Sequence, residues 1–171
     1  EIARTAGLTR GAVYWHFRNK ADLFNALLDR VRLPLAELLP QLEGSAGHDP
    51  LRTLRELCVY TFERLATDRR RQRVYTILFH RCEFLDEVNP VLARVDALAA
   101  DFERLIVGYF RTAQTRGDLR VGLEPPTCAY ALRVFMLGVH RDWLRNPKGF
   151  DIARQAGPLA DALFAGLRAS G

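Results

Sequence analysis

Apolar residues recur along this chain three or four positions apart, which is the spacing of one face of a helix. The pattern is clear through 51–65 and recurs through 74–85, 92–113, 128–143 and 159–167. No segment shows the strict alternation of apolar and polar residues that is typical of strands, and the chain has no internal repeat or low-complexity tract. The pattern therefore predicts an all-α protein.

Capping residues indicate where these helices begin and end. Asp49-Pro50 and Asn89-Pro90 each combine an N-cap residue with a proline suited to the first turn. Glu124-Pro125 opens a strongly apolar helix that ends before Asn146-Pro147, and Gly117 ends the helix before it. A last helix is expected to start near 151.

Two short helices joined by a turn are predicted at the start of the chain. Gly7 is suited to the left-handed residue that ends one helix, and Thr9 is suited to the N-cap of the next. The second helix then places Ala12 and Phe17 at core spacing. A helix of about two turns is marginal alone, so it must pack against its neighbours. Residues 1–20 therefore indicate a helix-turn-helix whose second helix enters the major groove of DNA.

The next predicted helix connects this head to the rest of the chain. Asn19 is suited to its N-cap, with an acid three residues later at Asp22. Apolar positions at helical spacing run through 23–31 and resume through 35–42, on the far side of Pro34. A proline inside a helix removes a hydrogen bond and kinks or breaks it. We expect a long connector that is bent or broken at this proline.

Charge is distributed unevenly along the chain. Residues 1–20 contain four cationic side chains and one acidic one, a net +3 of the total +5, so residues 21–171 carry only +2. A basic head on a nearly neutral body is typical of a protein that meets a polyanion with one end. No apolar run is long enough to span a membrane, and no signal peptide is visible, so we expect a cytoplasmic protein with no membrane partner.

The residues that most often carry catalytic or metal chemistry are scattered. Three cysteines, Cys58, Cys82 and Cys128, lie far apart among apolar residues, which argues against a disulfide framework and a zinc site. We expect buried, reduced thiols, with a redox-sensing cysteine as the alternative. The histidines form no catalytic motif, so no enzymatic activity and no cofactor are expected. His80 with Glu83 near Cys82 would allow a metal site, which we consider the lesser interpretation.

The run from Gly7 to Lys20, Gly-Leu-Thr-Arg-Gly-Ala-Val-Tyr-Trp-His-Phe-Arg-Asn-Lys, resembles the recognition helix of the TetR family of bacterial repressors almost residue for residue. The likeness is greatest to AcrR/TtgR-like regulators of multidrug efflux pumps. A surface helix with aromatic residues in its core is the less specific alternative. The resemblance implies a DNA-binding head over 1–30 and a ligand-binding and dimerisation body over 31–171. It also implies that the head is incomplete, with further helix preceding Glu1.

The residues expected to contact DNA lie on and beside this recognition helix. They are Thr9, Arg10, Gly11, Tyr14, Trp15, His16 and Lys20. An arginine near the helix start can bond a guanine edge twice, which is worth about 1–3 kcal/mol of discrimination. The glycine lets the backbone approach a base closely, and the threonine, tyrosine, histidine and lysine are placed for phosphates. Trp15 either stacks on a sugar or packs inward, and a structural role is the alternative for His16.

A second resemblance lies in the body. The segment 77–84, Ile-Leu-Phe-His-Arg-Cys-Glu-Phe, closely resembles the helix of AcrR-like regulators that lines a large apolar cavity for drugs, antibiotics, dyes and plant phenolics. The residues expected to contact such a ligand are Tyr75, Leu78, Phe79, Cys82, Glu83, Phe110, Met136, Val139 and His140. Tyr75 and Phe79 lie one turn apart on a common face. His80 and Glu83 are polar anchors or bond each other, and the aromatic stripe would serve equally as plain core.

The basic run 69–73 falls at the start of a predicted helix, where cations oppose the helix dipole. Its side chains form a solvated face or, alternatively, contact the head or a phosphate.

By resemblance, the last two helices, about 125–146 and 151–168, pair with the same helices of a second chain. A homodimer would double the short DNA site into a palindrome. The chain is thus expected to be a repressor of a multidrug efflux operon that hydrophobic drug-like inducers release from double-stranded operator DNA. A ligand would act by changing the spacing of the two heads, through the connector around Pro34. A TetR-like regulator of metabolism that answers an endogenous apolar ligand is the alternative.

Overall fold

The computed structural model describes residues 9–31, 35–77, 79 and 90–169, and within these ranges every regular element is a helix. The helices are α2 (Arg10–His16), α3 (Lys20–Val31), α4 (Leu35–Ser45), α5 (Pro50–Thr67), α6 (Arg69–Thr76), α7 (Pro90–Arg116), α8 (Pro125–Arg145) and α9 (Ile152–Phe164). An isolated antiparallel bridge joins Leu119 to Arg168. The all-α prediction is confirmed.

Side-chain caps start most of these helices. The side-chain oxygens of Thr9 and Asn19 each accept a hydrogen bond from the backbone N–H three residues ahead, at 3.2 and 2.8 Å. Asp49, Asp68 and Asp151 cap α5, α6 and α9 in the same manner. Each cap satisfies a backbone N–H that has no partner inside the helix. Three of these five caps, those at Thr9, Asn19 and Asp49, were predicted from the sequence, because the bonds are local.

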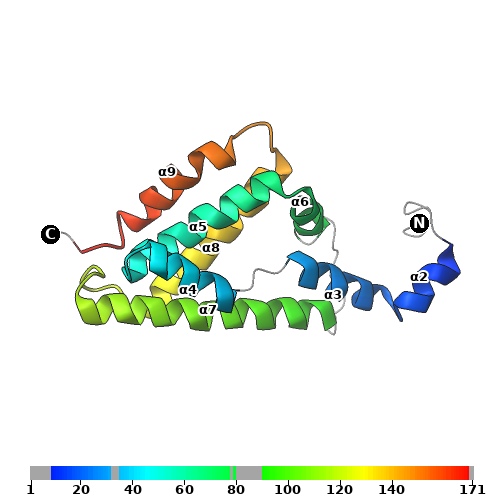
Figure 1. Ribbon diagram of the computed structural model, residues 1–171, viewed down its shortest axis with the longest axis horizontal. Coiled ribbons are helices and arrows are strands. Elements are labelled where there is room, and N and C mark those ends of the chain that lie inside the picture. Colours follow the sequence, from blue (N-terminus) through cyan, green and yellow to red (C-terminus); the bar gives the residue numbers. More distant parts are fainter. Residues whose placement is uncertain (1–8, 32–34, 78, 80–89, 170–171) are drawn as a thin grey trace.

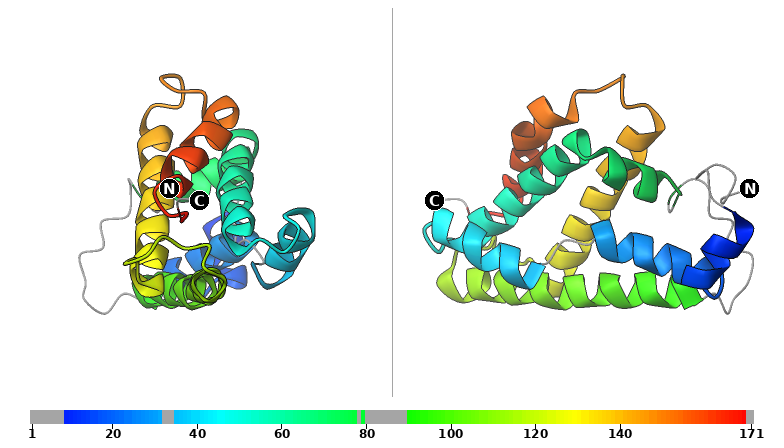
Figure 2. Two further views of the ribbon diagram at one scale, coloured as in Figure 1. Left: turned by 90° about the vertical axis from the view of Figure 1, so that its left-hand side faces the viewer. Right: turned by 45° about the vertical axis from the view of Figure 1, so that its right-hand side comes forward.

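The helices form an open, roughly triangular body with a protruding head. Helix α7 runs along the base, and α5 and α8 rise obliquely from it (Figure 1). Helices α9 and α4 both pack on α5. Helix α3 lies along the N-terminal half of α7 (Figure 2), and α2 is at the end of the molecule farthest from α9 (Figure 1). The head therefore contacts the body through α3.

The core lies where the apolar faces of α5, α7, α8 and α9 meet. Its large, fully buried side chains include Leu51, Leu54, Leu57, Phe62, Ile106, Phe110, Leu132 and Ile152. Burying each of these contributes about 1.5–3 kcal/mol relative to exposure. Arg55 on α5 also holds α9, because its Nε and Nη2 donate to the two carboxylate oxygens of Asp161 at 2.5 and 3.0 Å. This hydrogen-bonded pair lowers the pKa of the Asp161 carboxyl.

The buried thiols agree with the expectation of reduced cysteines. Cys58 and Cys128 are free and buried, and burial raises the pKa of the Cys58 thiol to about 12. A thiol with so high a pKa is a poor nucleophile at neutral pH. Cys82 lies outside the described residues. Within those residues, no helix combines the length and apolarity needed to cross a membrane.

The structure differs from the sequence prediction in two local features. The last helix ends at Phe164, before the predicted end at 168, because the chain turns there and the carbonyl of Leu167 accepts a hydrogen bond from the N–H of Arg120. Ala12, expected at a core position, is exposed, because α2 lies away from the body helices. Helix α3 ends at Val31 and α4 begins at Leu35; Pro34 itself lies outside the described residues.

Candidate functional sites

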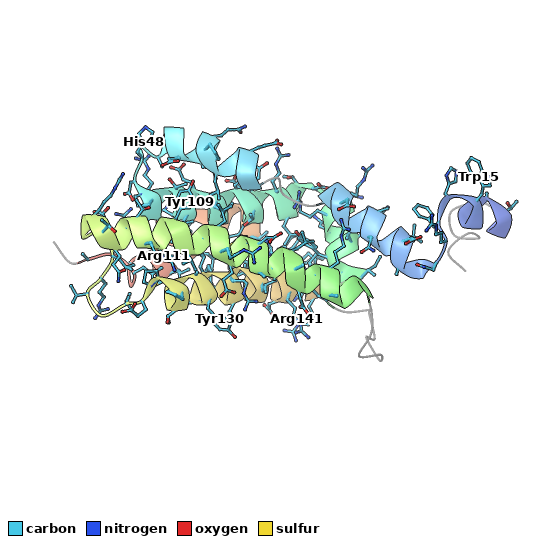
Figure 3. All side chains as sticks on the ribbon, turned by 90° about the horizontal axis from the view of Figure 1, so that it is seen from below. Trp15, His48, Tyr109, Arg111, Tyr130 and Arg141 are labelled. Atoms are coloured by element: carbon cyan, nitrogen blue, oxygen red, sulfur yellow. The ribbon has the colours of Figure 1, made fainter. Side chains whose placement is uncertain are left out.

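Helix α2 presents an exposed face at the tip of the molecule. Thr9, Gly11, Trp15 and His16 are all exposed, and 82% of the surface of Trp15 is accessible (Figure 3). The indole makes an edge-on contact with the imidazole of His16, with ring centroids 4.7 Å apart. The alternative that Trp15 packs inward is therefore wrong for the described structure. An exposed tryptophan on a short helix is available for contact with a partner.

Three further residues predicted to contact DNA belong to the same region. Arg10 and Tyr14 lie in α2, and Lys20 is the first residue of α3. The structure does not describe the side chains of these three residues.

Nothing in the described fold requires a glycine at position 11. It lies inside α2, and a Cβ built on it would meet only the Oγ1 of Thr9, at 4.0 Å. Because glycine weakens a helix interior relative to alanine, its presence here costs stability. The space at this position is thus open to something outside the chain.

Helix α3 joins the exposed α2 to the body. It packs against α6 and against α7, and the carboxylate of Asp29 pairs with the guanidinium of Arg94 on α7. Two elements of the body therefore contact the last helix of the head.

The basic run at the start of α6 is a solvated face, as one interpretation expected, except at one residue. Arg69, Arg70 and Arg73 are exposed, whereas Arg71 is buried. Asp68 offsets the unfavourable placement of these cations at the helix start. Its carboxylate accepts hydrogen bonds from the N–H groups of Arg71 and Arg70, and these bonds hold its pKa below the usual range.

Five rings from three parts of the chain form a cluster beside α6, which we call the ring cluster. Tyr75 lies 5.6 Å from Phe79 and 6.0 Å from His140, measured between ring centroids. Phe62 on α5 lies 5.4 Å from His140 and 6.1 Å from Phe135, with both pairs near edge-to-face. Three of these rings belong to predicted ligand residues, and the fold brings them together.

His140 is the polar member of the ring cluster. Only 7% of its surface is accessible, and this burial lowers its pKa from 6.5 to about 4, against the effect of a hydrogen bond to the backbone of Thr61. The nearby charge of Arg71 lowers the pKa further. The imidazole is therefore neutral at physiological pH.

The other predicted ligand residues are placed differently. Met136 is buried and Val139 is partly buried, both packed in the core around α8. Phe110 is fully buried on α7, inside the main core. Leu78, Cys82 and Glu83 lie outside the described residues, as does His80. Among the described residues, no cluster of three metal-ligating side chains is present.

Sequence reasoning missed Phe62, Phe135 and Arg71 as neighbours of this site. The two phenylalanines belong to ordinary apolar stripes, which do not distinguish a lining residue from plain core. Arg71 lies four residues before Tyr75, on the same face of α6, but the exposed Arg70 stands in the same relation to the buried Val74, so spacing alone gave no signal.

Helix α8 carries an apolar stripe on its outward face. Tyr130, Val134 and Leu137 have 55%, 45% and 38% of their surfaces exposed, and their spacing places them on one side of the helix. Figure 3 shows Tyr130 and Arg141 projecting along the same edge of the molecule. Contiguous exposed apolar side chains of this kind mark interaction surfaces.

Two parts of the chain match models of known protein families. Residues 49–168 match the model of the MAATS-type transcriptional repressor C-terminal region, and residues 1–27 match the model of the bacterial regulatory proteins of the tetR family. The HTH-type transcriptional repressor BepR of Brucella suis is 36% identical over 169 residues, which cover 99% of this chain and 81% of BepR.

Two solved structures are also similar. NalD, the secondary repressor of the MexAB-OprM multidrug efflux pump in Pseudomonas aeruginosa, superposes with a TM-score of 0.86 at 43% identity, covering 98% of this chain and 84% of NalD. SmeT, the repressor of the Stenotrophomonas maltophilia multidrug efflux pump SmeDEF, has been solved in complex with triclosan. That complex superposes with a TM-score of 0.78 at 29% identity and covers 99% of this chain and 81% of SmeT.

Proposed function

The chain belongs to the TetR family of bacterial transcriptional repressors, and from that premise we propose that it represses a multidrug efflux operon until a hydrophobic ligand releases it from DNA. In this proposal residues 1–30 form the DNA-binding head and residues 31–171 the ligand-binding and dimerisation body. The repressors of efflux pumps among its relatives support the choice of operon, and the SmeT–triclosan complex supports a small hydrophobic ligand.

The exposed face of α2 is the observation that carries the DNA-binding part of the proposal. Gly11 leaves room for the close approach of a base edge, and the exposed Trp15 is free to stack on a sugar. Arg10 reads a guanine edge from the start of the helix. Thr9, Tyr14, His16 and Lys20 hold phosphates and fix the register of the helix in the groove.

A second copy of the chain completes the operator-binding unit in this proposal. The exposed stripe of Tyr130, Val134 and Leu137 on α8, together with α9, packs on the same elements of the partner. Such an interface is isologous, so the same surface patch of both chains packs together across a two-fold axis. Two heads then read two half-sites about one helical turn, or a multiple of it, apart.

The contacts of α3 suggest how a ligand changes DNA affinity. A ligand held at the ring cluster touches α6 and α8, and α6 packs directly on α3. A small displacement of α6 therefore changes the direction in which the head points. The Asp29–Arg94 pair holds the same helix to α7 and forms a second connection. Coupling of this kind is typically about 1–3 kcal/mol between ligand and DNA.

Fluorescence anisotropy tests the DNA-binding part. Labelled DNA from the region upstream of the gene is titrated with full-length protein and compared with a scrambled duplex at one fixed salt concentration. We expect a preference of at least about 1,000-fold for the upstream DNA. Sedimentation of the complex should show two chains, or a multiple of two, on each palindrome. Equal affinity for the two duplexes would contradict the proposal.

A further inference from the structure

Two polar atoms beside the ring cluster are buried without a hydrogen-bond partner among the described residues. They are the Nε of Arg71 and the Nε2 of His140, each with less than 1 Å² of accessible surface. The residues themselves are 8% and 7% exposed. Buried polar groups in folded proteins are nearly always paired, because an unpaired one loses its hydrogen bonds to water and gains nothing in return. Two such atoms on neighbouring side chains point to a missing partner.

The two atoms belong to one interhelical region. Arg71 and Tyr75 lie one turn apart on the same face of α6, and the Tyr75 ring contacts the imidazole of His140 on α8. The charge of Arg71 is close enough to act on His140. Asp68 forms an ion pair with the guanidinium, but its Oδ2 lies 3.8 Å from Nε, beyond hydrogen-bond distance. The partly exposed rings of Tyr75 and Phe79 border this region.

The protonation of His140 determines which chemical group of a ligand complements both the Nε of Arg71 and the Nε2 of His140. The imidazole bonds the backbone of Thr61, and because Nε2 has no partner, that bond is made through Nδ1–H. In this neutral tautomer Nε2 is an acceptor, whereas the Nε–H of Arg71 is a donor. A hydroxyl group both donates and accepts, so it is the smallest group whose chemistry complements both atoms. A carboxylate would need a protonated imidazole, which burial disfavours, and an ether oxygen leaves Nε2 unpaired.

We propose that Arg71 and His140 are the polar anchor of the ligand site and select apolar ligands that carry a hydroxyl group. The hydroxyl donates to the Nε2 of His140 and accepts from the Nε–H of Arg71, while the apolar body of the ligand packs against the partly exposed rings of Tyr75 and Phe79. The inference rests on the proposed function, in which the inducer binds at the ring cluster.

Calorimetric titration with β-naphthol and its methyl ether tests the anchor. The two compounds share one ring system and one oxygen, but the ether cannot donate. We expect wild-type protein to bind β-naphthol about tenfold more tightly than the ether, the effect of one hydrogen bond to a buried acceptor. The His140→Asn variant keeps an amide near the position of Nδ1 and lacks Nε2, so the ratio should fall to about one.

Variants of two neighbouring arginines separate the anchor from general effects of charge. Arg71→Met should weaken binding of both oxygen compounds relative to naphthalene, which has no oxygen. Arg70→Met removes an exposed arginine from the same helix and should leave every ratio unchanged. Circular dichroism melting establishes that each variant is folded before it is titrated.

Three results would overturn the inference. The first is equal affinity of the wild-type protein for β-naphthol and its methyl ether. The second is a ratio of these two affinities that stays unchanged in folded His140→Asn. The third is that neither compound binds at its solubility limit. The titration contains no DNA, so its outcome is independent of operator binding. If the protein prefers the hydroxyl compound but has no preference for upstream DNA, the anchor is supported and the proposed function is contradicted.

Discussion

The ring of Tyr75 on α6 lies 6.0 Å from the imidazole of His140 on α8, measured between centroids. This contact joins the helix that packs on α3 of the head to the helix that carries the exposed apolar stripe. A ligand at the ring cluster would therefore touch both the element that aims the head and the element proposed to hold the second chain.

The burial of His140 should make stability depend on pH. Its pKa is about 4 in the folded chain and 6.5 when unfolded, so the unfolded state takes up the proton first as pH falls. The contribution of the neutral imidazole to the free energy of unfolding is fully present above about pH 6.5. It is lost progressively down to about pH 4, by up to about 3 kcal/mol. Urea unfolding of wild type and His140→Asn across this range measures the difference. Identical pH profiles for the two proteins would show that His140 is not buried as described.

Replacing Gly11 with alanine should separate DNA binding from stability. The position is helical and a Cβ there is unobstructed within the described chain, so Gly11→Ala should stabilise the free protein by up to about 1 kcal/mol. The same methyl group would hold the helix away from the bases and weaken specific DNA binding. Thermal unfolding and anisotropy on operator DNA measure the two effects. Undiminished operator affinity would remove Gly11 from the DNA interface.

The pair between Arg55 and Asp161 should stabilise the packing of α9 on α5. A double-mutant cycle with Arg55→Met and Asp161→Asn should give a coupling of about 0.5–1 kcal/mol, because both side chains are partly exposed. Raising the salt concentration should reduce this coupling. Urea unfolding of the four proteins provides the values, and a coupling of zero at low salt would mean that the hydrogen bonds contribute nothing.

A charge on the outward face of α8 should prevent dimerisation without unfolding the chain. Val134 is 45% exposed, so Val134→Glu places its carboxylate in water in the single chain but inside the proposed interface in the dimer. Light scattering after gel filtration should show a monomer, and operator affinity should fall by at least about tenfold. Gln114→Glu, on the exposed surface of α7, is the matched control. A dimeric Val134→Glu protein would place the interface elsewhere.

The sequence predicts local features of this fold better than distant ones. The caps at Thr9, Asn19 and Asp49 could be read because each bond spans two or three residues. The pairing of Tyr75 with Phe79 follows from helical spacing alone. The contact of Tyr75 with His140 was only expected from resemblance, since it depends on how α6 packs against α8.

The residues that were missed depend on the orientation of whole helices. Four of the five residues in 69–73 are arginines, and nothing in their spacing distinguishes Arg71, which α6 turns inward, from its exposed neighbours. The end of α9 at Phe164 depends on the bridge between Leu119 and Arg168, which joins segments far apart in the chain.

The most direct test of the account is release of the full-length protein from its upstream DNA by ligand. Anisotropy of the labelled complex is followed while structurally unrelated hydrophobic drugs, with and without a hydroxyl group, are added one at a time. We expect several of them to release the DNA, with the hydroxyl-bearing compounds acting at lower concentration. A complex that none of these drugs dissociates would contradict a multidrug-responsive repressor, and the search would then turn to a single endogenous ligand.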